Sequence, residues 1–224
     1  MRNISIAIDG PAAAGKSTIA QEVAKRINFT YIDTGAMYRA VTLYCLENDI
    51  DCENEKEVER VLTNINIFLG KNHTVFLNDR NVSEDIRSRL VNANVSYIAS
   101  YKKVRLFLVE QQRKMAKNTS VVMDGRDIGS YVLPNADVKI FQIADVETRA
   151  QRRFLENKEK GIEGSYESIL EELKKRDYID SHRDFAPLQK SPDAIELDTS
   201  NMNINEVVDE VIKIINQKVG VINE

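Results

Sequence analysis

Residues 10–17 read Gly-Pro-Ala-Ala-Ala-Gly-Lys-Ser, which matches the phosphate-binding pattern G-x-x-x-x-G-K-[ST]. In such a loop, backbone N–H groups and the start of the next helix bind a polyphosphate, and the lysine adds positive charge. The residue after the lysine supplies a hydroxyl to Mg²⁺. The residues expected to bind the nucleotide are Gly10, Pro11, Ala12, Ala13, Ala14, Gly15, Lys16, Ser17 and Thr18.

Further charged residues follow in positions that suit phosphoryl transfer. Asp124 ends the apolar run 120–123, and an acidic residue at the tip of a core strand is where a P-loop enzyme holds Mg²⁺. We therefore expect Ser17 and Asp124 at a metal site. Guanidinium groups stay charged and bind phosphate in a bidentate manner, which suits the binding of a donor and an acceptor. The arginines that could do this are Arg126, Arg149, Arg152, Arg153, Arg176 and Arg183.

The elements that position these residues alternate between strand and helix. Apolar runs at 4–8, 29–32, 119–123, 138–143 and 194–198 predict strands. Helical patterns are expected near 15–27, 35–47, 83–98, 101–117, 145–157, 165–182 and 203–217, with Thr34 as an N-cap. This order predicts an α/β fold with a five-stranded parallel sheet covered by helices on both faces.

Residues 64–82 interrupt that alternation. Two short alternating strands flank a polar turn at 70–72, which is typical of a β-hairpin. We expect a small antiparallel sheet inserted into the parallel fold. The glycines and charges of 157–165 predict a mobile loop.

Composition limits the possible partners and location. The chain has 224 residues, 42% hydrophobic content and a formal net charge of −4, which does not favour general binding of nucleic acid. No segment resembles a signal peptide or a membrane span, so a cytoplasmic protein is expected. Cys45 and Cys52 are expected to be free and reduced, and a monomer is expected because no exposed apolar stripe requires a partner.

Four segments together resemble bacterial-type cytidylate kinase, a nucleoside monophosphate (NMP) kinase family with a P-loop. They are residues 10–18, 33–39, 82–87 and 124–129, and the later segments 176–177, 183 and 186–188 fit as well. The resemblance covers about residues 4 to 217 in the expected order. It implies a single P-loop kinase domain over 1–224, with an inserted NMP-binding subdomain at about 64–115 and a lid at about 149–165.

The resemblance also implies a reaction and residue roles. The reaction transfers a phosphoryl group from ATP to CMP or dCMP, with Mg²⁺, giving ADP and CDP or dCDP. The roles of the acceptor residues are as follows: Arg39, Arg126 and Arg183 bind the acceptor phosphate, Thr34, Ser96, Arg105 and Asp127 line the nucleoside pocket, and Arg176 and Asp180 contact the sugar. Arg149, Arg152 and Arg153 belong to a lid over ATP. Lys16, Arg39, Arg126 and Arg183 are the expected catalytic residues.

Three alternatives remain. The nearest is a broader UMP/CMP kinase. A P-loop switch should contain N-K-x-D, but residues 157–160 read Asn-Lys-Glu-Lys, and a motor ATPase usually has a glutamate where this chain has Gly125. A non-catalytic nucleotide-binding module would not need separate arginine sets for donor and acceptor.

Overall fold

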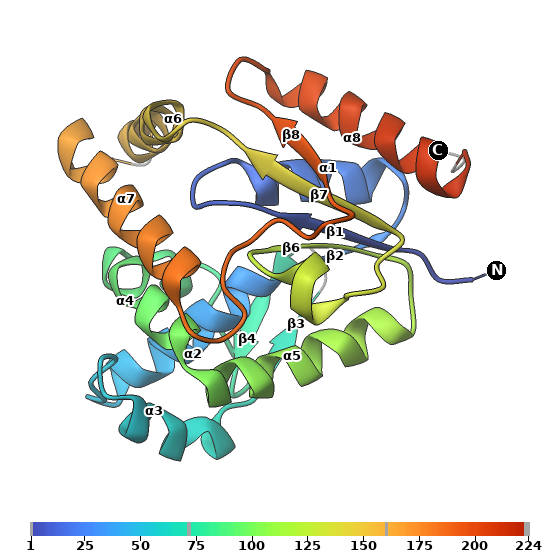
Figure 1. Cartoon of the computed structure of the whole chain (residues 1–224). Coiled ribbons are helices and arrows are strands. Elements are labelled where there is room, and N and C mark those ends of the chain that lie inside the picture. The colour runs from blue at the N-terminus through green and yellow to red at the C-terminus, as the bar shows by residue number, and fades with distance from the viewer. Residues whose placement is uncertain (1, 71–72, 160, 222–224) are drawn as a thin grey trace. The chain divides into compact units, whose positions relative to one another are not determined.

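The computed structural model describes residues 2–70, 73–159 and 161–221 (Figure 1). Its contacts divide the chain into two compact units. Unit 1 comprises Met1–Tyr31 and Thr119–Glu224, and unit 2 comprises Ile32–Asn118. The predicted inserted subdomain, 64–115, lies within unit 2, and its role in binding a monophosphate stays a prediction.

A five-stranded sheet forms the centre of unit 1. The strands are β1 (Ser5–Asp9), β2 (Thr30–Asp33), β6 (Val121–Gly125), β7 (Val138–Ile143) and β8 (Ile195–Asp198), in the order β2-β6-β1-β7-β8. Strand β2 crosses the boundary between the units, at Tyr31. Strand β1 pairs in parallel with β6 and β7, and β7 with β8. The predicted parallel sheet is confirmed.

The helices of unit 1 lie between or after these strands in the chain. They are α1 (Lys16–Arg26), the π-helical segment η4 (Ile128–Val132), α6 (Val146–Glu159), α7 (Tyr166–His182) and α8 (Ile204–Val219). Helices α1 and α8 lie side by side along the sheet (Figure 1). Their apolar faces share one core with the inner strands, in which Ile8, Val23 and Val211 are fully buried. This packing fixes the position of the loop between β1 and α1.

Unit 2 is mainly helical and contains a small antiparallel sheet. Its helices are α2 (Thr34–Glu47), α3 (Glu55–Val61), η1 (Leu62–Asn64), η3 (Asp85–Arg87), α4 (Arg89–Ser100) and α5 (Lys102–Lys117). Strands β3 (Ile67–Leu69), β4 (Val75–Leu77) and β5 (Arg80–Asn81) form the second sheet. The predicted hairpin is confirmed and gains β5 as a third strand, although residues 71–72 of its turn lie outside the described residues. Cys45 and Cys52 of this unit are free, as predicted, and both are buried.

Several predicted boundaries were wrong for local reasons. Asp33, not Thr34, is the N-cap of α2, because its carboxylate accepts a hydrogen bond from the backbone N–H of Ala36. The predicted helix 83–98 is divided into η3 and α4, because the hydroxyl of Ser88 caps the start of α4. Helix α6 continues to Glu159, so the first residues of the predicted loop 157–165 are helical. Helix α3 was not predicted.

Candidate active site

Residues 10–17, the P-loop of this chain, follow β1 and continue into the start of α1. They have the backbone shape that an anion-binding loop requires. Gly10 has φ 152°, and a Cβ there would be 2.0 Å from the carbonyl oxygen of Gln142 on β7. Gly15 has φ 85° and caps α1 without a side-chain hydrogen bond. The first N–H groups of α1 therefore have no side-chain cap at this position, which fits the binding of phosphate.

Gln142 supports this loop from β7. Its side-chain amide donates a hydrogen bond to the carbonyl oxygen of Ala14, and the residue is buried. Gln142 is not among the residues predicted from sequence, because a glutamine within a predicted strand carries no local sign of a contact with the P-loop. It helps to hold the loop shape between Gly10 and Lys16.

Lys16, Ser17 and Asp124 meet at the ends of β1 and β6. The ammonium group of Lys16 donates to the carbonyl oxygen of Pro11 at 2.7 Å, and the Ser17 hydroxyl donates to Asp124 Oδ2 at 2.8 Å. Tyr31, a second residue missed from sequence, donates its hydroxyl to Asp124 Oδ1 at 2.7 Å. Burial, followed by the charge of Arg126, lowers the pKa of Lys16 well below its usual value.

Asp9 connects β1 to the segment that carries Arg126 and Asp127. Its two carboxylate oxygens accept hydrogen bonds from the backbone N–H groups of Ile128, at 2.8 Å, and Gly129, at 2.7 Å. Burial raises the pKa of Asp9 to about 7, despite these two hydrogen bonds. Asp9 directly precedes the P-loop motif, but only the fold shows its contact with residues more than 100 positions later.

Two buried carboxylates, Asp180 and Asp127, pair with arginines of unit 1. Arg126 Nε donates to Asp180 Oδ2 at 2.9 Å, and Arg183 lies 3.5 Å from Asp127 Oδ1. Burial raises the pKa of Asp180, but the charges of Arg126, Arg176 and Arg183 outweigh it, so the pKa lies below its usual value. Asp180 is therefore ionised near neutral pH and can accept hydrogen bonds.

The three arginines of α6 have different surroundings. Arg149 is buried and donates to the carbonyl oxygens of Ala144 and Ala12 as well as to Asp177. Arg152 donates to the carbonyl oxygen of Thr199, and Arg153 pairs with Glu156. The common role in ATP binding that the sequence suggested for them stays a prediction.

Four of the predicted site residues belong to unit 2. Arg39 Nη2 donates to Asp33 Oδ2 at 2.9 Å, and the same carboxylate caps α2. Arg105 is 1% exposed, donates to the carbonyl oxygen of Ala99 and lies 5.3 Å from the centre of the Tyr38 ring. Thr34 and Ser96 are also buried.

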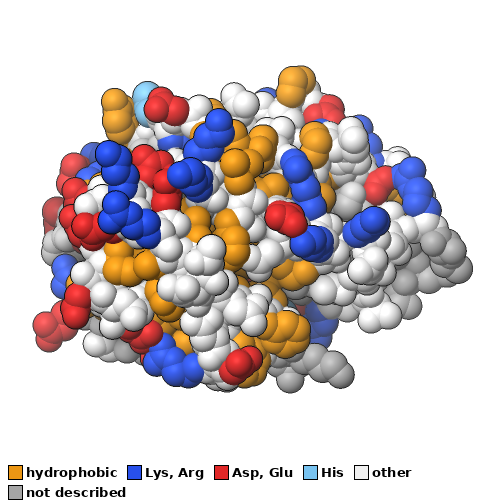
Figure 2. Space-filling model, turned by 90° about the horizontal axis from the view of Figure 1, so that it is seen from below, with side chains coloured by type: hydrophobic (Ala, Val, Ile, Leu, Met, Phe, Trp, Pro, Cys, Tyr) orange, Lys and Arg blue, Asp and Glu red, His pale blue; other side chains and the backbone are white. Residues whose placement is uncertain are grey.

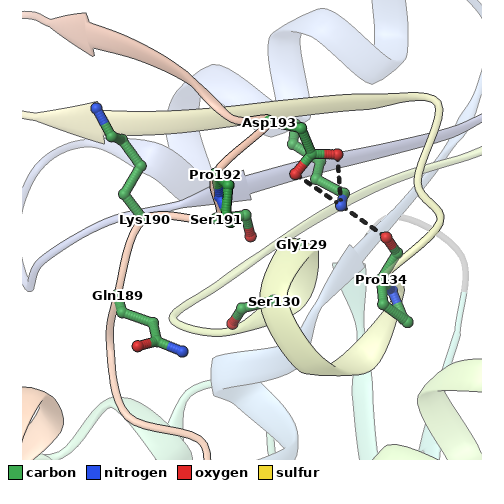
Figure 3. A pocket seen from close by; sticks show the side chains of 9 residues that line it. Gly129, Ser130, Pro134, Gln189, Lys190, Ser191, Pro192 and Asp193 are labelled. Carbon is green, nitrogen blue, oxygen red and sulfur yellow. Dashed lines mark hydrogen bonds and ion pairs between the residues drawn. The ribbon is translucent and has the colours of Figure 1, made fainter.

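A pocket of about 370 Å³ lies beside η4 in unit 1 (Figure 3). It is lined by Gly129, Ser130, Pro134, Lys139, Gln189, Lys190, Ser191, Pro192 and Asp193, none of which is a predicted site residue. The ammonium of Lys139 donates to the carbonyl oxygen of Pro134 and pairs with Asp193 at 2.8 Å. Its charge is therefore already matched by groups of the protein.

Among the residues that the structure describes, there is no cluster of metal-ligating side chains and no membrane-spanning helix. Within those residues, no group of three or more His, Cys, Asp or Glu side chains could hold a metal ion. A membrane span needs a longer and more apolar helix than any found in residues 2–70, 73–159 and 161–221. Basic and acidic side chains are interspersed on the face shown in Figure 2.

Comparison with known proteins gives consistent matches. The family model for cytidylate kinase matches residues 6–217. A cytidylate kinase of Fusobacterium nucleatum is 54% identical, with 95% of this chain and 97% of that protein aligned. A cytidylate kinase of Bacillus cereus is 51% identical, with 96% of each chain aligned.

Solved structures support the fold at much lower identity. A gluconokinase from Sinorhizobium meliloti has a TM-score of 0.51 at 11% identity, with 96% of this chain and 94% of that chain aligned. An uncharacterised protein from Eubacterium ventriosum has the same TM-score at 18% identity, covering 96% of this chain and 99% of that one. The fold is thus that of P-loop kinases, and the family match and the two relatives show that the chain belongs to the cytidylate kinase family.

Proposed function

We propose that the protein transfers the terminal phosphoryl group of ATP to CMP and dCMP, giving ADP and CDP or dCDP. The observation that carries the proposal is the meeting of Lys16, Ser17 and Asp124 at the P-loop of a cytidylate kinase family member. Little covalent chemistry is required of the protein in such a reaction. Its residues have to align two phosphates and stabilise the charge on them.

On the donor side, the P-loop binds the phosphates of ATP. The N–H groups from Ala13 to Thr18 and the ammonium of Lys16 are the donors we assign to them. Ser17 and Asp124 present a hydroxyl and a carboxylate whose oxygens are 2.8 Å apart, and Mg²⁺ prefers oxygen ligands. These two residues would hold Mg²⁺, which supplies charge neutralisation on the transferred group when it is bound.

On the acceptor side, Arg39, Arg126 and Arg183 bind the phosphate of CMP. Each of these guanidinium groups lies beside a carboxylate of the protein: Asp33, Asp180 and Asp127, respectively. Such pairing restricts the rotamers of the arginines before substrate binds, and this lowers the entropy lost on binding. The acceptor oxygen is ionised near neutral pH, so no general base is needed.

The nucleoside is recognised by polar side chains, of which Arg176 is half-buried and the others are buried. We assign Thr34, Ser96, Arg105 and Asp127 to the nucleoside pocket, and Arg176 and Asp180 to the sugar hydroxyls. A carboxylate can accept a hydrogen bond from the exocyclic amino group of cytosine, which uracil lacks. This chemistry favours CMP over UMP.

A panel of acceptors tests the specificity. ADP release from ATP should be fastest with CMP and dCMP, slower with UMP and slow with AMP. Equal rates with CMP and UMP would show a broader UMP/CMP kinase and would overturn the assignment of Asp127 and Arg105 to the base. Hydrolysis of ATP that no monophosphate changes would instead support a P-loop switch.

Two expectations from sequence remain predictions. They are the monomeric state and the cytoplasmic location. Sedimentation of the purified protein measures the first, and fractionation of the producing cells measures the second.

A further inference from the structure

Ala12, the third residue of the P-loop motif, contacts α6 and α7 through its main chain and its side chain. Its backbone N–H donates to Asp177 Oδ1 at 3.1 Å, and its carbonyl oxygen accepts from Arg149 Nη1 at 3.0 Å. Its methyl group is buried with Ala150 of α6 and Leu173 of α7. Ala12 is thus held through its N–H group, its carbonyl oxygen and its methyl group.

The two polar groups that hold Ala12 also hold each other. Arg149 Nη1 forms an ion pair with Asp177 Oδ2, and Arg149 Nε donates to the carbonyl oxygen of Ala144 at 2.9 Å. Arg149 is 6% exposed, so its charge is desolvated and needs these partners. Helices α6 and α7 are neighbours that pack against each other. The Arg149–Asp177 pair therefore joins both helices to the P-loop through Ala12.

The position of this contact within the loop gives it a consequence for nucleotide binding. Ala13, the next residue, has φ 56°, a left-handed conformation that is uncommon for a residue other than glycine. Arg149 binds the carbonyl oxygen of the peptide group that joins Ala12 to Ala13, so it restrains the orientation of the chain from which the following N–H groups extend. Because the N–H of Ala12 is bound to Asp177, it is not among the phosphate donors in this arrangement.

We propose that Arg149 and Asp177 are positioning residues that set the shape of the P-loop through Ala12, and so control the affinity for ATP and ADP but not that for CMP. Arg149 then acts on the nucleotide through the loop and not by touching it. The inference rests on the proposed function, because it assumes that this loop binds the phosphate donor.

Three variants test the proposal. Asp177→Ala removes the acceptor for Ala12 N–H and the partner of Arg149. Asp177→Asn keeps an oxygen that can accept from Ala12 but loses the charge opposite Arg149. Glu171→Gln is the matched control, because Glu171 forms an exposed ion pair with Lys174 on the same helix. The control should leave every measured value within about twofold of wild type.

Calorimetric titration with ADP is the first readout, since it requires no CMP and no turnover. Loss of one hydrogen bond to a charged group should weaken ADP binding about tenfold in Asp177→Ala, with Asp177→Asn between this variant and wild type. In the kinase assay, KM for ATP should rise by a similar factor, while KM for CMP changes by less than about twofold. Thermal unfolding of each variant, measured in parallel with these assays, shows whether that variant is folded.

The outcomes separate this inference from the proposed function. If wild type phosphorylates CMP but folded Asp177→Ala binds ADP as wild type does, the positioning role is wrong. An equal loss of affinity for ADP and CMP, with a lowered Tm, would also overturn it in favour of a structural role alone. If wild type binds ADP but does not phosphorylate CMP, the proposed function fails, and the titration with ADP still decides the role of Asp177.

Discussion

Asp9 gives a pH dependence of stability that a single substitution should remove. Burial raises the pKa of its carboxyl from the usual 3.8 to about 7; hydrogen bonds from Gly129 and Ile128 lower it, Asp127 raises it and Lys16 lowers it. The folded protein therefore keeps a proton on Asp9 over a pH range in which the unfolded chain has lost it. Asn in place of Asp9 has a similar shape and no titration in this range.

The sign and size follow from proton linkage. Because the pKa is higher in the folded state, the stabilising contribution of Asp9 is complete below pH 3.8 and is lost as the pH rises through about 7. A difference of one bound proton changes the free energy of unfolding by about 1.4 kcal/mol per pH unit. From about pH 5 to about pH 8.5, that difference persists over about two pH units, so wild type should lose about 2.7 kcal/mol through Asp9.

Urea unfolding of wild type and Asp9→Asn, without nucleotide, measures this loss. All other titrating groups are common to the two proteins, so the difference between their curves isolates Asp9. The free energy of unfolding of Asp9→Asn should gain about 2.7 kcal/mol relative to wild type between the two pH values. Curves that stay parallel to within about 0.5 kcal/mol would refute the reasoning, because Asp9 would then be ionised in the folded state throughout.

The remaining predictions concern catalysis, specificity and the P-loop. Lys16→Met should lower kcat about 100-fold or more while CMP binding changes little, since it removes a charge that acts on the transferred phosphoryl group; an unchanged kcat would contradict its role. Asp127→Ala should reduce the ratio of kcat/KM for CMP over UMP about tenfold, and an unaltered ratio would exclude Asp127 from base recognition. Gly10→Ala should destabilise the fold by about 3 kcal/mol or more, because the new Cβ would lie 2.0 Å from the Gln142 carbonyl oxygen. Gly164→Ala is its control in thermal unfolding, since a Cβ at Gly164 meets nothing within 4 Å.

Features encoded by neighbouring residues could be predicted well. The P-loop follows a β-branched strand and opens a helix, so its motif and its structural context occur in one continuous segment. The parallel sheet follows from the alternation of apolar runs and helical patterns. Helix α3 escaped prediction because it is only seven residues long and Val58 is the one residue of it that is fully buried.

Features that depend on long-range contacts could not be predicted. Thr34 and Asp33 are both good caps, and only the backbone geometry selects Asp33. The carboxylate of Asp9 reaches Gly129, and Asp177 reaches Ala12, across more than 100 residues in each case. A sequence does not distinguish a charged residue that pairs with another residue of the protein from one that binds substrate. Arg149 illustrates this: the sequence does not show that it is buried, or that it contacts Ala12 and Asp177.

The central claim is that the bound ATP gives its terminal phosphoryl group to CMP. Incubation of the protein with Mg²⁺, CMP and ATP labelled in the γ-phosphate, followed by separation of the products, tests it directly. We predict that the label appears in CDP, with one ADP formed for each CMP consumed. Label released as inorganic phosphate at a rate that CMP does not alter would contradict the account.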